Sequence, residues 1–343
     1  MRKPITAVTT GDPAGIGPEI CVEALTKQEV YDKMNPFLIG DETVIRKAMK
    51  VKGIDYRIHL IQDPQEGIYQ RGTIDLMTTG SYDVDSIEYG KVQKLCGRMA
   101  MDFIMKSIDL GNNGQIDVVG TAPINKQAIK LVGVPEPGHT EIFQDYTHSP
   151  YALTMFNVEK LRVFFLSRHI SLQNAIKFAN KEHCLEFLTN IDEVMRGLGF
   201  DHPEIALAAL NPHGSDNGLF GTEEHDELIP AVQEARQRGI NAVGPVPADS
   251  VFWKMRKGHY DAILSLYHDQ GHIACKTLDF EKAITITWGL PFMRSAVDHG
   301  TAFDIAGKGI AQSVSMVESL TVACDYWQMQ QRARARQATV AAH

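Results

Sequence analysis

Three histidines follow predicted strands at equivalent positions. His169, His213 and His268 each lie one to three residues beyond an apolar run. The carboxyl ends of parallel strands share one edge of a sheet, so we expect these imidazoles at the same edge. Three imidazoles with an open fourth position are typical of a catalytic metal site. Such ligands suit zinc, cobalt, nickel or manganese.

Two carboxylates accompany these histidines. Asp269 is adjacent to His268, and Asp249 lies in the segment PADS (247–250). Either could orient an imidazole or act as a general base. A solvated loop carboxylate is the simpler interpretation of Asp249. His272 follows closely and is predicted to line the site without binding the metal.

Two cations indicate an anionic substrate. Lys276 lies eight residues after His268, and Arg294 follows the predicted strand 284–287. A planar guanidinium suits bidentate contact with a phosphate or carboxylate, and an ammonium supplies a point charge. A surface position would explain Lys276 equally well.

Glycine-rich and polar loops follow other predicted strands. The loop 10–19 contains Gly11 and Asp12 and leads into a helix, where glycines allow close approach of a ligand and a helix N-terminus favours an anion. It matches neither GxGxxG nor GxxxxGK[ST], so neither nucleotide-binding motif applies, and a purely structural tight turn would explain this loop equally well.

The segment 121–126 precedes His139 and Thr140, which could orient a carboxylate or hydroxyl group of a ligand. Taken alone, His139 is better explained as an incidental loop residue. The segment 298–309 resembles a binding loop.

The elements that must position these residues alternate between strand and helix. Predicted buried strands are 5–10, 36–39, 116–119, 162–166, 205–210, 262–267 and 284–287. Predicted helices include 18–25, 93–108, 171–198 and 227–238. Short apolar strands between helices predict an α/β fold with a largely parallel sheet covered on both faces.

Composition narrows the class of protein. The chain has 343 residues, 44% of them hydrophobic, which predicts about two domains. Its formal net charge of −8 argues against nucleic acid or an anionic membrane as the main partner. We see no apolar segment long enough for a membrane span and no signal peptide, so we expect a cytoplasmic protein. The five scattered cysteines form no CxxC pair and are expected to be reduced and packed.

These motifs, in this order, resemble the 4-hydroxythreonine-4-phosphate dehydrogenase (PdxA) family over nearly the whole chain. The segments that carry the resemblance are GDPAGIGPE (11–19), PGHTE (137–141), LNPH (210–213), PADS (247–250), YHDQG (267–271) and DHGTA (298–302). The closing loop, 299–308, also resembles the NAD-adenosine loop of isocitrate and isopropylmalate dehydrogenases, which explains how a dehydrogenase can lack GxGxxG.

The resemblance implies a two-domain isocitrate/isopropylmalate dehydrogenase-like fold with the active site in the interdomain cleft. We expect one domain over 1–134 plus about 275–343, and a second over about 135–274. Family members are homodimers whose active sites take residues from both subunits, so the metal site could be completed across the interface.

The resemblance also assigns residues to a metal, a substrate and a cofactor. It implies that His169, His213 and His268 bind a divalent metal (Zn, Mg, Mn or Co). Substrate contacts would come from His139, Thr140, Lys276, Thr285 and Arg294. NAD would contact Gly11, Asp12, His299, Gly300, Thr301 and Asp304.

Two positions depart from the vitamin B6 biosynthetic pattern. Thr285 stands where those enzymes usually place an asparagine, and His272-Ile273-Ala274 replaces a common Leu-Pro pair. Both departures resemble the branch that acts on D-threonate or D-erythronate 4-phosphate.

The predicted reaction is NAD-dependent oxidation and decarboxylation of a 4-phosphorylated four-carbon 3-hydroxy acid. The substrate is D-threonate or D-erythronate 4-phosphate, or 4-phosphohydroxy-L-threonine for pyridoxal phosphate biosynthesis. The general base is Asp249, Asp269 or a relayed water, and Lys276 assists. Two alternatives are an NAD-independent, metal-dependent lyase or hydrolase on phosphorylated sugar acids, and a non-catalytic metal-binding protein.

Overall fold

The computed structural model describes residues 2–341, which form two compact units. Unit 1 comprises Met1–Ala152 and Ile284–Gln328, and unit 2 comprises Leu153–Ala283 and Met329–His343. The sequence predicted boundaries near 134 and 274. The structure instead assigns 135–152, which include His139 and Thr140, to unit 1.

Unit 1 contains a seven-stranded sheet in the order β3-β4-β2-β1-β5-β12-β11. Its strands are β1 (Ile5–Thr9), β2 (Asn35–Ile39), β3 (Arg57–Leu60), β4 (Thr73–Met77), β5 (Val118–Thr121), β11 (Ile284–Trp288) and β12 (Met293–Val297). Only β11 runs antiparallel to its neighbour. The central strands are buried along their length, as expected of a sheet covered on both faces.

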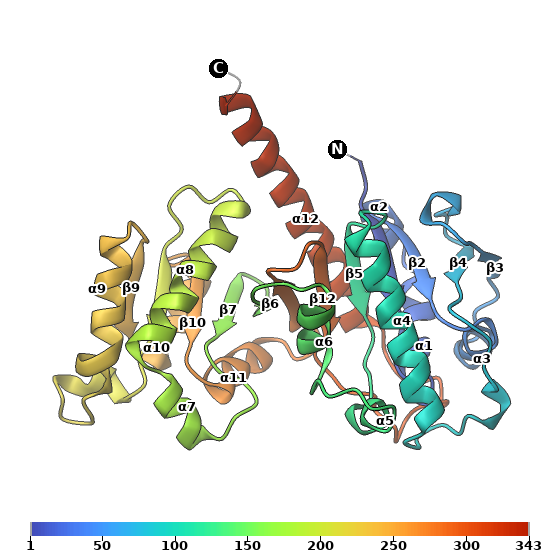
Figure 1. The fold of residues 1–343 in the computed structure, drawn as a ribbon, viewed down its shortest axis with the longest axis horizontal. Coiled ribbons are helices and arrows are strands. Elements are labelled where there is room, and N and C mark those ends of the chain that lie inside the picture. Colours follow the sequence, from blue (N-terminus) through green and yellow to red (C-terminus); the bar gives the residue numbers. More distant parts are fainter. Residues whose placement is uncertain (1, 342–343) are drawn as a thin grey trace. The chain divides into compact units, whose positions relative to one another are not determined.

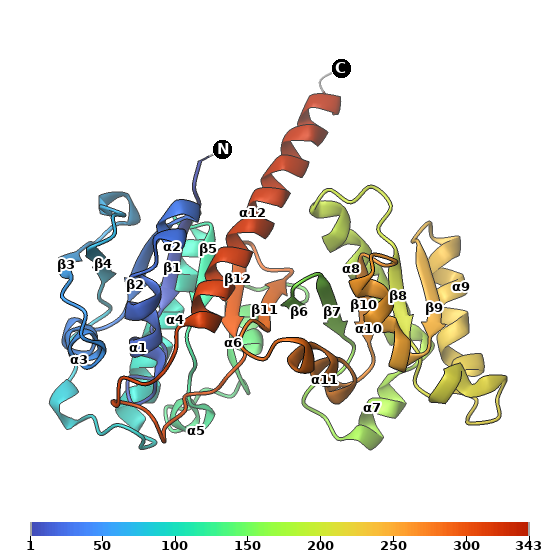
Figure 2. The same cartoon turned by 180° about the vertical axis from the view of Figure 1, so that it is seen from behind.

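Helices cover both faces of this sheet. They are α1 (Gly17–Ala24), α2 (Gln28–Lys33), α3 (Glu42–Lys52), α4 (Lys94–Asn112), α5 (Lys126–Lys130), α6 (His139–Tyr146) and the first part of α12 (Val314–Ala341), with short turns η1 (Pro64–Glu66) and η2 (Val84–Ser86). Helix α4 lies in front of the sheet in Figure 1, and α12 lies in front of it in Figure 2. Phe103 and Ile104 of α4 pack with Phe37 of β2 in the core.

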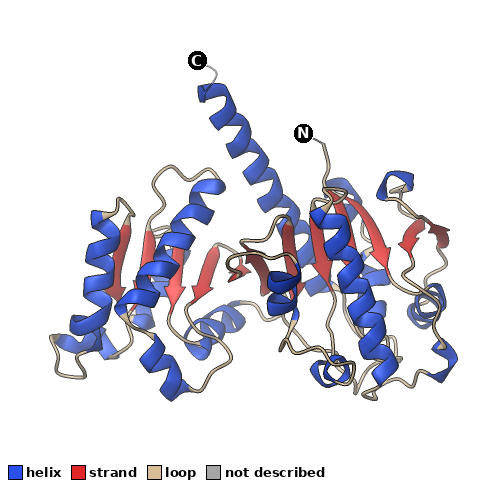
Figure 3. Cartoon of the chain, in the orientation of Figure 1, coloured by secondary structure: helices blue, strands red, loops and turns tan. Residues whose placement is uncertain are grey.

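Unit 2 has a five-stranded sheet in the order β6-β7-β10-β8-β9. Its strands are β6 (Leu153–Val158), β7 (Leu161–Phe165), β8 (Ile205–Ala208), β9 (Ala242–Val246) and β10 (Ala262–Ser265). Only β6 is antiparallel to its neighbour. Figure 3 shows the alternation of strands and helices in both units, which confirms the predicted α/β class with largely parallel sheets.

The helices of unit 2 also cover two faces. They are α7 (Leu172–Phe178), α8 (Lys181–Gly197), α9 (Ile229–Gln237), α10 (Ala248–Arg256) and α11 (His268–Leu278), with η3 (Pro212–Asp216) and η4 (Glu224–Leu228). Val251 of α10 and Cys275 of α11 pack into one core on the sheet. All five cysteines are free and buried, as the sequence predicted. Among the described residues, no helix combines the length and the apolar character needed to cross a membrane.

The structure corrects two predicted helices. The segment predicted as one helix over 171–198 is two helices, because the Asn180 side chain accepts a hydrogen bond from His183 N at 3.0 Å and starts α8. The segment predicted over 227–238 is η4, a π-helical turn, followed by α9, which begins with Pro230 in its first turn.

Five strands were not predicted: β3, β4, β6, β9 and β12. β3 is short and lies at the edge of its sheet, with every residue at least partly exposed. β12 contains Arg294 and Ser295, whose polar side chains hide a strand that is in fact buried.

Helix α4 approaches α5 so closely that residue 97 must be glycine. A Cβ at Gly97 would lie 2.1 Å from the carbonyl oxygen of Ala128. We expect Gly97→Ala to lower the free energy of unfolding by about 1–3 kcal/mol, since backbone atoms must move apart.

Gly197→Ala in α8 is the control. Nothing lies within 4 Å of its Cβ position, so alanine should raise the stability by up to about 1 kcal/mol. Urea unfolding followed by circular dichroism measures both, and a Gly97→Ala protein as stable as the wild type would contradict this packing.

Candidate active site

Arg294 lies on β12, between β5 and β11 in the unit 1 sheet, and is only 3% exposed. Its Nη1 donates to Thr287 Oγ1 at 2.8 Å, and its Nη2 donates to Thr121 Oγ1 at 2.9 Å. The guanidinium carbon lies 5.1 Å from the centre of the Phe143 ring. Two hydroxyls and an aromatic ring therefore fix the plane of the guanidinium, and neither hydroxyl adds a negative charge.

Sequence reasoning missed Thr121 and Thr287, the two residues that orient Arg294. Thr121 donates its own proton to the Ser295 carbonyl at 3.1 Å, which leaves its oxygen free to accept from the guanidinium. Both threonines lie at or near the end of a strand next to β12. The signal in the sequence was a hydroxyl residue at the end of each neighbouring strand.

His139 begins α6, after Gly138, which provides no side-chain cap. Burial lowers the pKa of His139 well below its ordinary value, and the charges of Arg294 and Lys126 lower it further. The ring is therefore neutral at physiological pH. Its Nε2 is buried and has no hydrogen-bond partner among the described residues.

The N-terminus of α6 and two cations make this part of unit 1 electropositive. Thr140 lies in the first turn of α6, half-buried. Lys126 is exposed, and sequence reasoning did not single it out. Backbone N–H groups at a helix N-terminus favour an anion, and Arg294 and Lys126 add positive charge. The arrangement suits a phosphate or carboxylate.

Thr285 lies on β11, two residues before Thr287, so both side chains are on the same face of the strand. Its hydroxyl donates to the Ala296 carbonyl at 3.3 Å, and the residue is half-buried. Thr285 therefore shares a strand face with a residue that orients Arg294.

Gly11 and Asp12 form a turn against the segment that follows β5. Gly11 has φ +70°, and a Cβ there would lie 2.3 Å from the Pro123 oxygen. The buried Asp12 donates its amide to that oxygen at 2.9 Å and accepts from Ala14 N at 2.8 Å. Burial raises the pKa of Asp12 to about 6. Its Oδ2 has no hydrogen-bond partner among the described residues.

The segment 298–309, hereafter the C-terminal loop, packs on this glycine-rich turn. Ile16 N donates to the Thr301 carbonyl at 3.0 Å, and a Cβ at Gly15 would lie 2.9 Å from Thr301 Cβ. Gly300 and Asp304 are exposed. The two loops are therefore in close contact, while the backbone of Gly300 and the side chain of Asp304 are exposed. A dinucleotide could contact these exposed groups.

In unit 2, His169 and His268 lie near each other, with ring centroids 6.1 Å apart. Two imidazoles bound to one zinc ion at about 2.0–2.1 Å would have centroids roughly 5 Å apart, so a small adjustment would suffice. His268 Nδ1 is 2.6 Å from Asp269 Oδ1, which directs Nε2 away from the carboxylate. A carboxylate on one ring nitrogen is the usual arrangement behind a metal-binding histidine.

His272 stacks on His268, and both line the same pocket. The ring centroids are 3.8 Å apart with an interplanar angle of 10°. His272 Nδ1 is 2.8 Å from the His268 carbonyl oxygen, and Phe156 and Phe165 contact its ring. Burial lowers the pKa of His272 to about 4. The neutral ring is therefore part of the packing that holds His268.

The structure does not gather the three predicted metal ligands into one group. His213 is exposed, in η3, with φ +55°. Within residues 2–341 there is no cluster of three or more histidine, cysteine or acidic side chains able to hold a metal ion. His169 and His268, with Asp269 behind His268, fit a divalent metal in part, and further ligands are still required.

Two further predicted catalytic residues lie in unit 2. Lys276 lines a pocket of about 390 Å³ along α11, together with His268, Asp269 and His272, and its Nζ is 5.4 Å from the Phe280 ring centre. Asp249 is exposed in the first turn of α10. Asp269 and Lys276 therefore line the same pocket.

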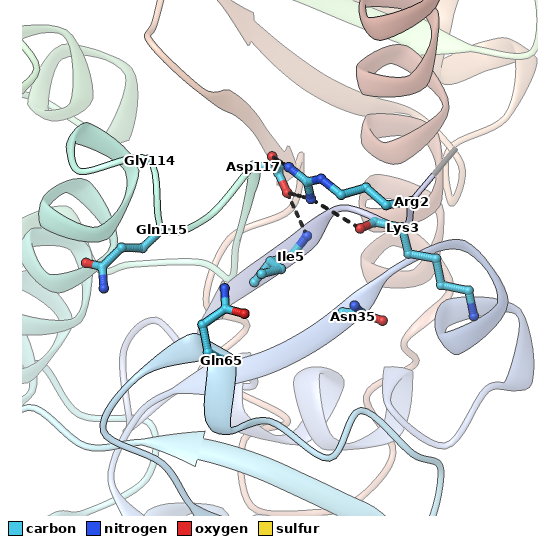
Figure 4. Close-up of a pocket in the computed structure, with 8 residues that line it drawn as sticks. All are labelled: Arg2, Lys3, Ile5, Asn35, Gln65, Gly114, Gln115 and Asp117. Atoms are coloured by element: carbon cyan, nitrogen blue, oxygen red, sulfur yellow. Dashed lines mark hydrogen bonds and ion pairs between the residues drawn. The ribbon is translucent and has the colours of Figure 1, made fainter.

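A pocket of unit 1, of about 440 Å³, lies at the amino ends of the strands, near the start of β1. Figure 4 shows Arg2 and Asp117, two of the lining residues, joined directly by hydrogen bonds. Arg2 donates to both oxygens of Asp117, at 2.6 and 2.7 Å, and Ile5 N donates to the same carboxylate at 2.9 Å. These charges neutralise each other, and we assign the pocket no part in the chemistry.

Comparison with known proteins identifies the family. Residues 32–323 match the family model described as "Pyridoxal phosphate biosynthetic protein PdxA". A protein of Halalkalibacterium halodurans named "Putative D-threonate 4-phosphate dehydrogenase" is 49% identical over 95% of this chain and 97% of its own length. A protein of the same name from Symbiobacterium thermophilum is 46% identical over 94% of this chain and 97% of its own length.

A solved structure agrees with this result. The crystal structure of 4-hydroxythreonine-4-phosphate dehydrogenase from Klebsiella pneumoniae has a TM-score of 0.89 and 36% identity, covering 95% of this chain and 98% of that one. Together with the order of the motifs and the residues around Arg294 and His268, these matches show that the chain belongs to the PdxA family.

Proposed function

We propose that this chain is a dehydrogenase that oxidises a 4-phosphorylated four-carbon 3-hydroxy acid with NAD and a divalent metal. The observation that carries the proposal is the electropositive group formed by Arg294, Lys126 and the N-terminus of α6. An anionic substrate would bind there through charge-assisted hydrogen bonds.

D-threonate 4-phosphate is the substrate that we propose within this class, with D-erythronate 4-phosphate as the closest variant. Two relatives at 46–49% identity carry the name of a D-threonate 4-phosphate dehydrogenase. Thr285, in place of the usual asparagine, and His272 support the same choice over 4-phosphohydroxy-L-threonine. A threonine hydroxyl already bonded to the Ala296 carbonyl has fewer hydrogen-bonding groups to offer an amine than an asparagine would have.

Residues of unit 1 would bind and orient the substrate. Arg294 would hold a phosphate or carboxylate in the plane set by Thr121 and Thr287. Neutral His139 could donate or accept a hydrogen bond through its unpaired Nε2, and Thr140 would supply a hydroxyl. Fixing the reacting carbon in this way lowers the entropic cost of reaching the transition state.

Residues of unit 2 would hold the metal. His169 and His268 would supply two ligands, and Asp269 would keep His268 Nε2 directed outward. A bound divalent ion supplies Lewis-acid activation of the substrate hydroxyl. We propose that His213 completes the site across the interface of a homodimer. The chain alone gathers two of the three histidines, which supports this assignment.

The remaining roles concern proton transfer and decarboxylation. Because Asp269 is already bonded to His268, its orienting role is the better supported, and Asp249 or a relayed water is the better candidate for the general base. Asp12 and the C-terminal loop would hold NAD, which would supply the hydride acceptor. We propose that the 3-keto acid then loses carbon dioxide, and that Lys276 stabilises the negative charge that develops.

An assay of NAD reduction tests the function directly. Purified protein with a divalent metal and D-threonate 4-phosphate should form NADH and release carbon dioxide. D-erythronate 4-phosphate and 4-phosphohydroxy-L-threonine serve as comparison substrates, and non-phosphorylated D-threonate is the negative control. Consumption of the phosphorylated acid without NADH would favour an NAD-independent lyase or hydrolase, and metal binding with no turnover of any substrate would favour a non-catalytic protein.

Replacement of Arg294 tests the anion site. Arg294→Lys keeps the charge but loses the two-pronged geometry, so KM for the phosphorylated acid should rise by about one to two orders of magnitude. Arg46→Lys on α3 is the control, because Arg46 is exposed and forms a surface ion pair with Glu42. A thermal melt checks that both variants fold, and an unchanged KM in Arg294→Lys would remove this residue from substrate binding.

Replacement of Asp269 tests the metal site without an activity measurement. Asp269→Asn removes the charge behind His268 Nδ1, so the affinity for zinc measured by calorimetry should fall about 10–100-fold. Asp201→Asn, an exposed position in unit 2, provides the same chemical change away from the histidines. Equal zinc affinity in the two variants would show that Asp269 does not orient a metal ligand.

A further inference from the structure

Two charged side chains hold the end of the C-terminal loop, and neither has a role in the scheme above. Glu19, at the start of α1, is 2% exposed. Its Oε1 accepts from Gly307 N at 2.6 Å, and its Oε2 accepts from Gly309 N at 3.1 Å. Both oxygens of a buried carboxylate are therefore bonded to the backbone of this loop.

Lys52, the last residue of α3, holds the carbonyl groups of the same segment. Its Nζ donates to the Gly309 oxygen at 3.1 Å and to the Ala311 oxygen at 2.7 Å. It also forms an ion pair with Glu23 Oε2 at 3.0 Å, and its side chain is 9% exposed. Residues 307–311 are thus held at their amides by a carboxylate and at their carbonyls by an ammonium.

The glycines of this segment allow that arrangement. Gly307 and Gly309 have φ of +77° and +71°, which side chains rarely adopt. A Cβ at Gly307 would lie 2.6 Å from the Tyr89 ring, and one at Gly309 would lie 2.7 Å from the Val51 oxygen. The loop therefore has one tightly packed backbone path between Glu19 and Lys52.

We infer that Glu19 and Lys52 are positioning residues that hold the C-terminal loop in its nucleotide-binding conformation before the nucleotide arrives. The inference rests on the proposed function, specifically on NAD binding by this loop. Fixing a loop in advance lowers the entropic cost of binding and so tightens it. Buried charges are costly unless they are hydrogen-bonded. Releasing the loop would take both backbone amides from Glu19 and both carbonyl partners from Lys52, which would keep only its ion pair with Glu23.

Glu19→Gln is the first test. The amide retains one acceptor oxygen but turns an N–H₂ group toward a backbone N–H, so one of the two bonds to Gly307 and Gly309 is lost. Without ligand, hydrogen exchange of the amides in 305–311 should become faster. The Kd for NAD, measured by calorimetry, should rise roughly ten-fold. The KM for NAD should rise with it, while kcat at saturating NAD and the KM for the acid substrate stay near wild-type values, a split that general damage to the fold would not give.

Lys52→Gln is the second variant and should change loop exchange and the Kd for NAD in the same direction, which carries the test if Glu19→Gln fails to fold. Glu29→Gln, an exposed position on α2, is the matched control and should bind NAD like the wild type. If wild-type protein binds NAD and both variants match its Kd and its loop exchange, the inference is overturned while the proposed function stands. Faster loop exchange with an unchanged Kd also overturns it. If the wild type itself binds no NAD, the cofactor assignment fails and the inference fails with it.

Discussion

A guanidinium buried in a β-sheet must have hydrogen-bond partners, and the strands on either side of β12 supply them in unit 1. Arg294 is opposite Thr287 in the antiparallel pair β11–β12, and Thr121 is opposite Ala296 in the parallel pair β5–β12. Side chains alternate between faces along a strand, so a shift of one residue in either pairing would turn a threonine away from Arg294. The register of β5, β11 and β12 therefore determines how the Arg294 guanidinium is oriented.

The polar chemistry of the chain is divided between its two units. Unit 1 carries the groups suited to anions and to a nucleotide, namely Arg294, His139 and the two loops that meet at Thr301. Unit 2 carries imidazoles backed by a carboxylate. In unit 2, His169 and His268 follow the ends of β7 and β10, where a parallel sheet presents its loops.

The sequence predicted the α/β class and the main parallel strands, because short apolar runs between helices have few other interpretations. It also predicted that Asp269 would lie beside His268, since adjacent residues cannot be far apart. It did not predict β12, because buried Arg294 and Ser295 obscure the apolar pattern, nor Thr121 and Thr287, whose importance comes from strand register. Glu19 was visible as part of a motif, but its partners lie nearly 300 residues away in the sequence, beyond the reach of local patterns. The grouping of His213 with the other histidines remains a prediction.

Gly120 of β5 creates a gap in the face of the sheet that Leu320 of α12 fills, since a Cβ at residue 120 would lie 2.3 Å from Leu320 Cδ2. The preceding residue of the helix, Ser319, donates its Oγ proton to Ser295 Oγ of β12 at 2.9 Å. Gly120 is adjacent in sequence to Thr121, and Ser295 is adjacent to Arg294, so both contacts lie next to the residues of the guanidinium site. A larger side chain at position 120 would therefore require a smaller one at position 320. The size of a side chain in the C-terminal helix is thereby limited by a strand that also carries one of the hydroxyls orienting Arg294.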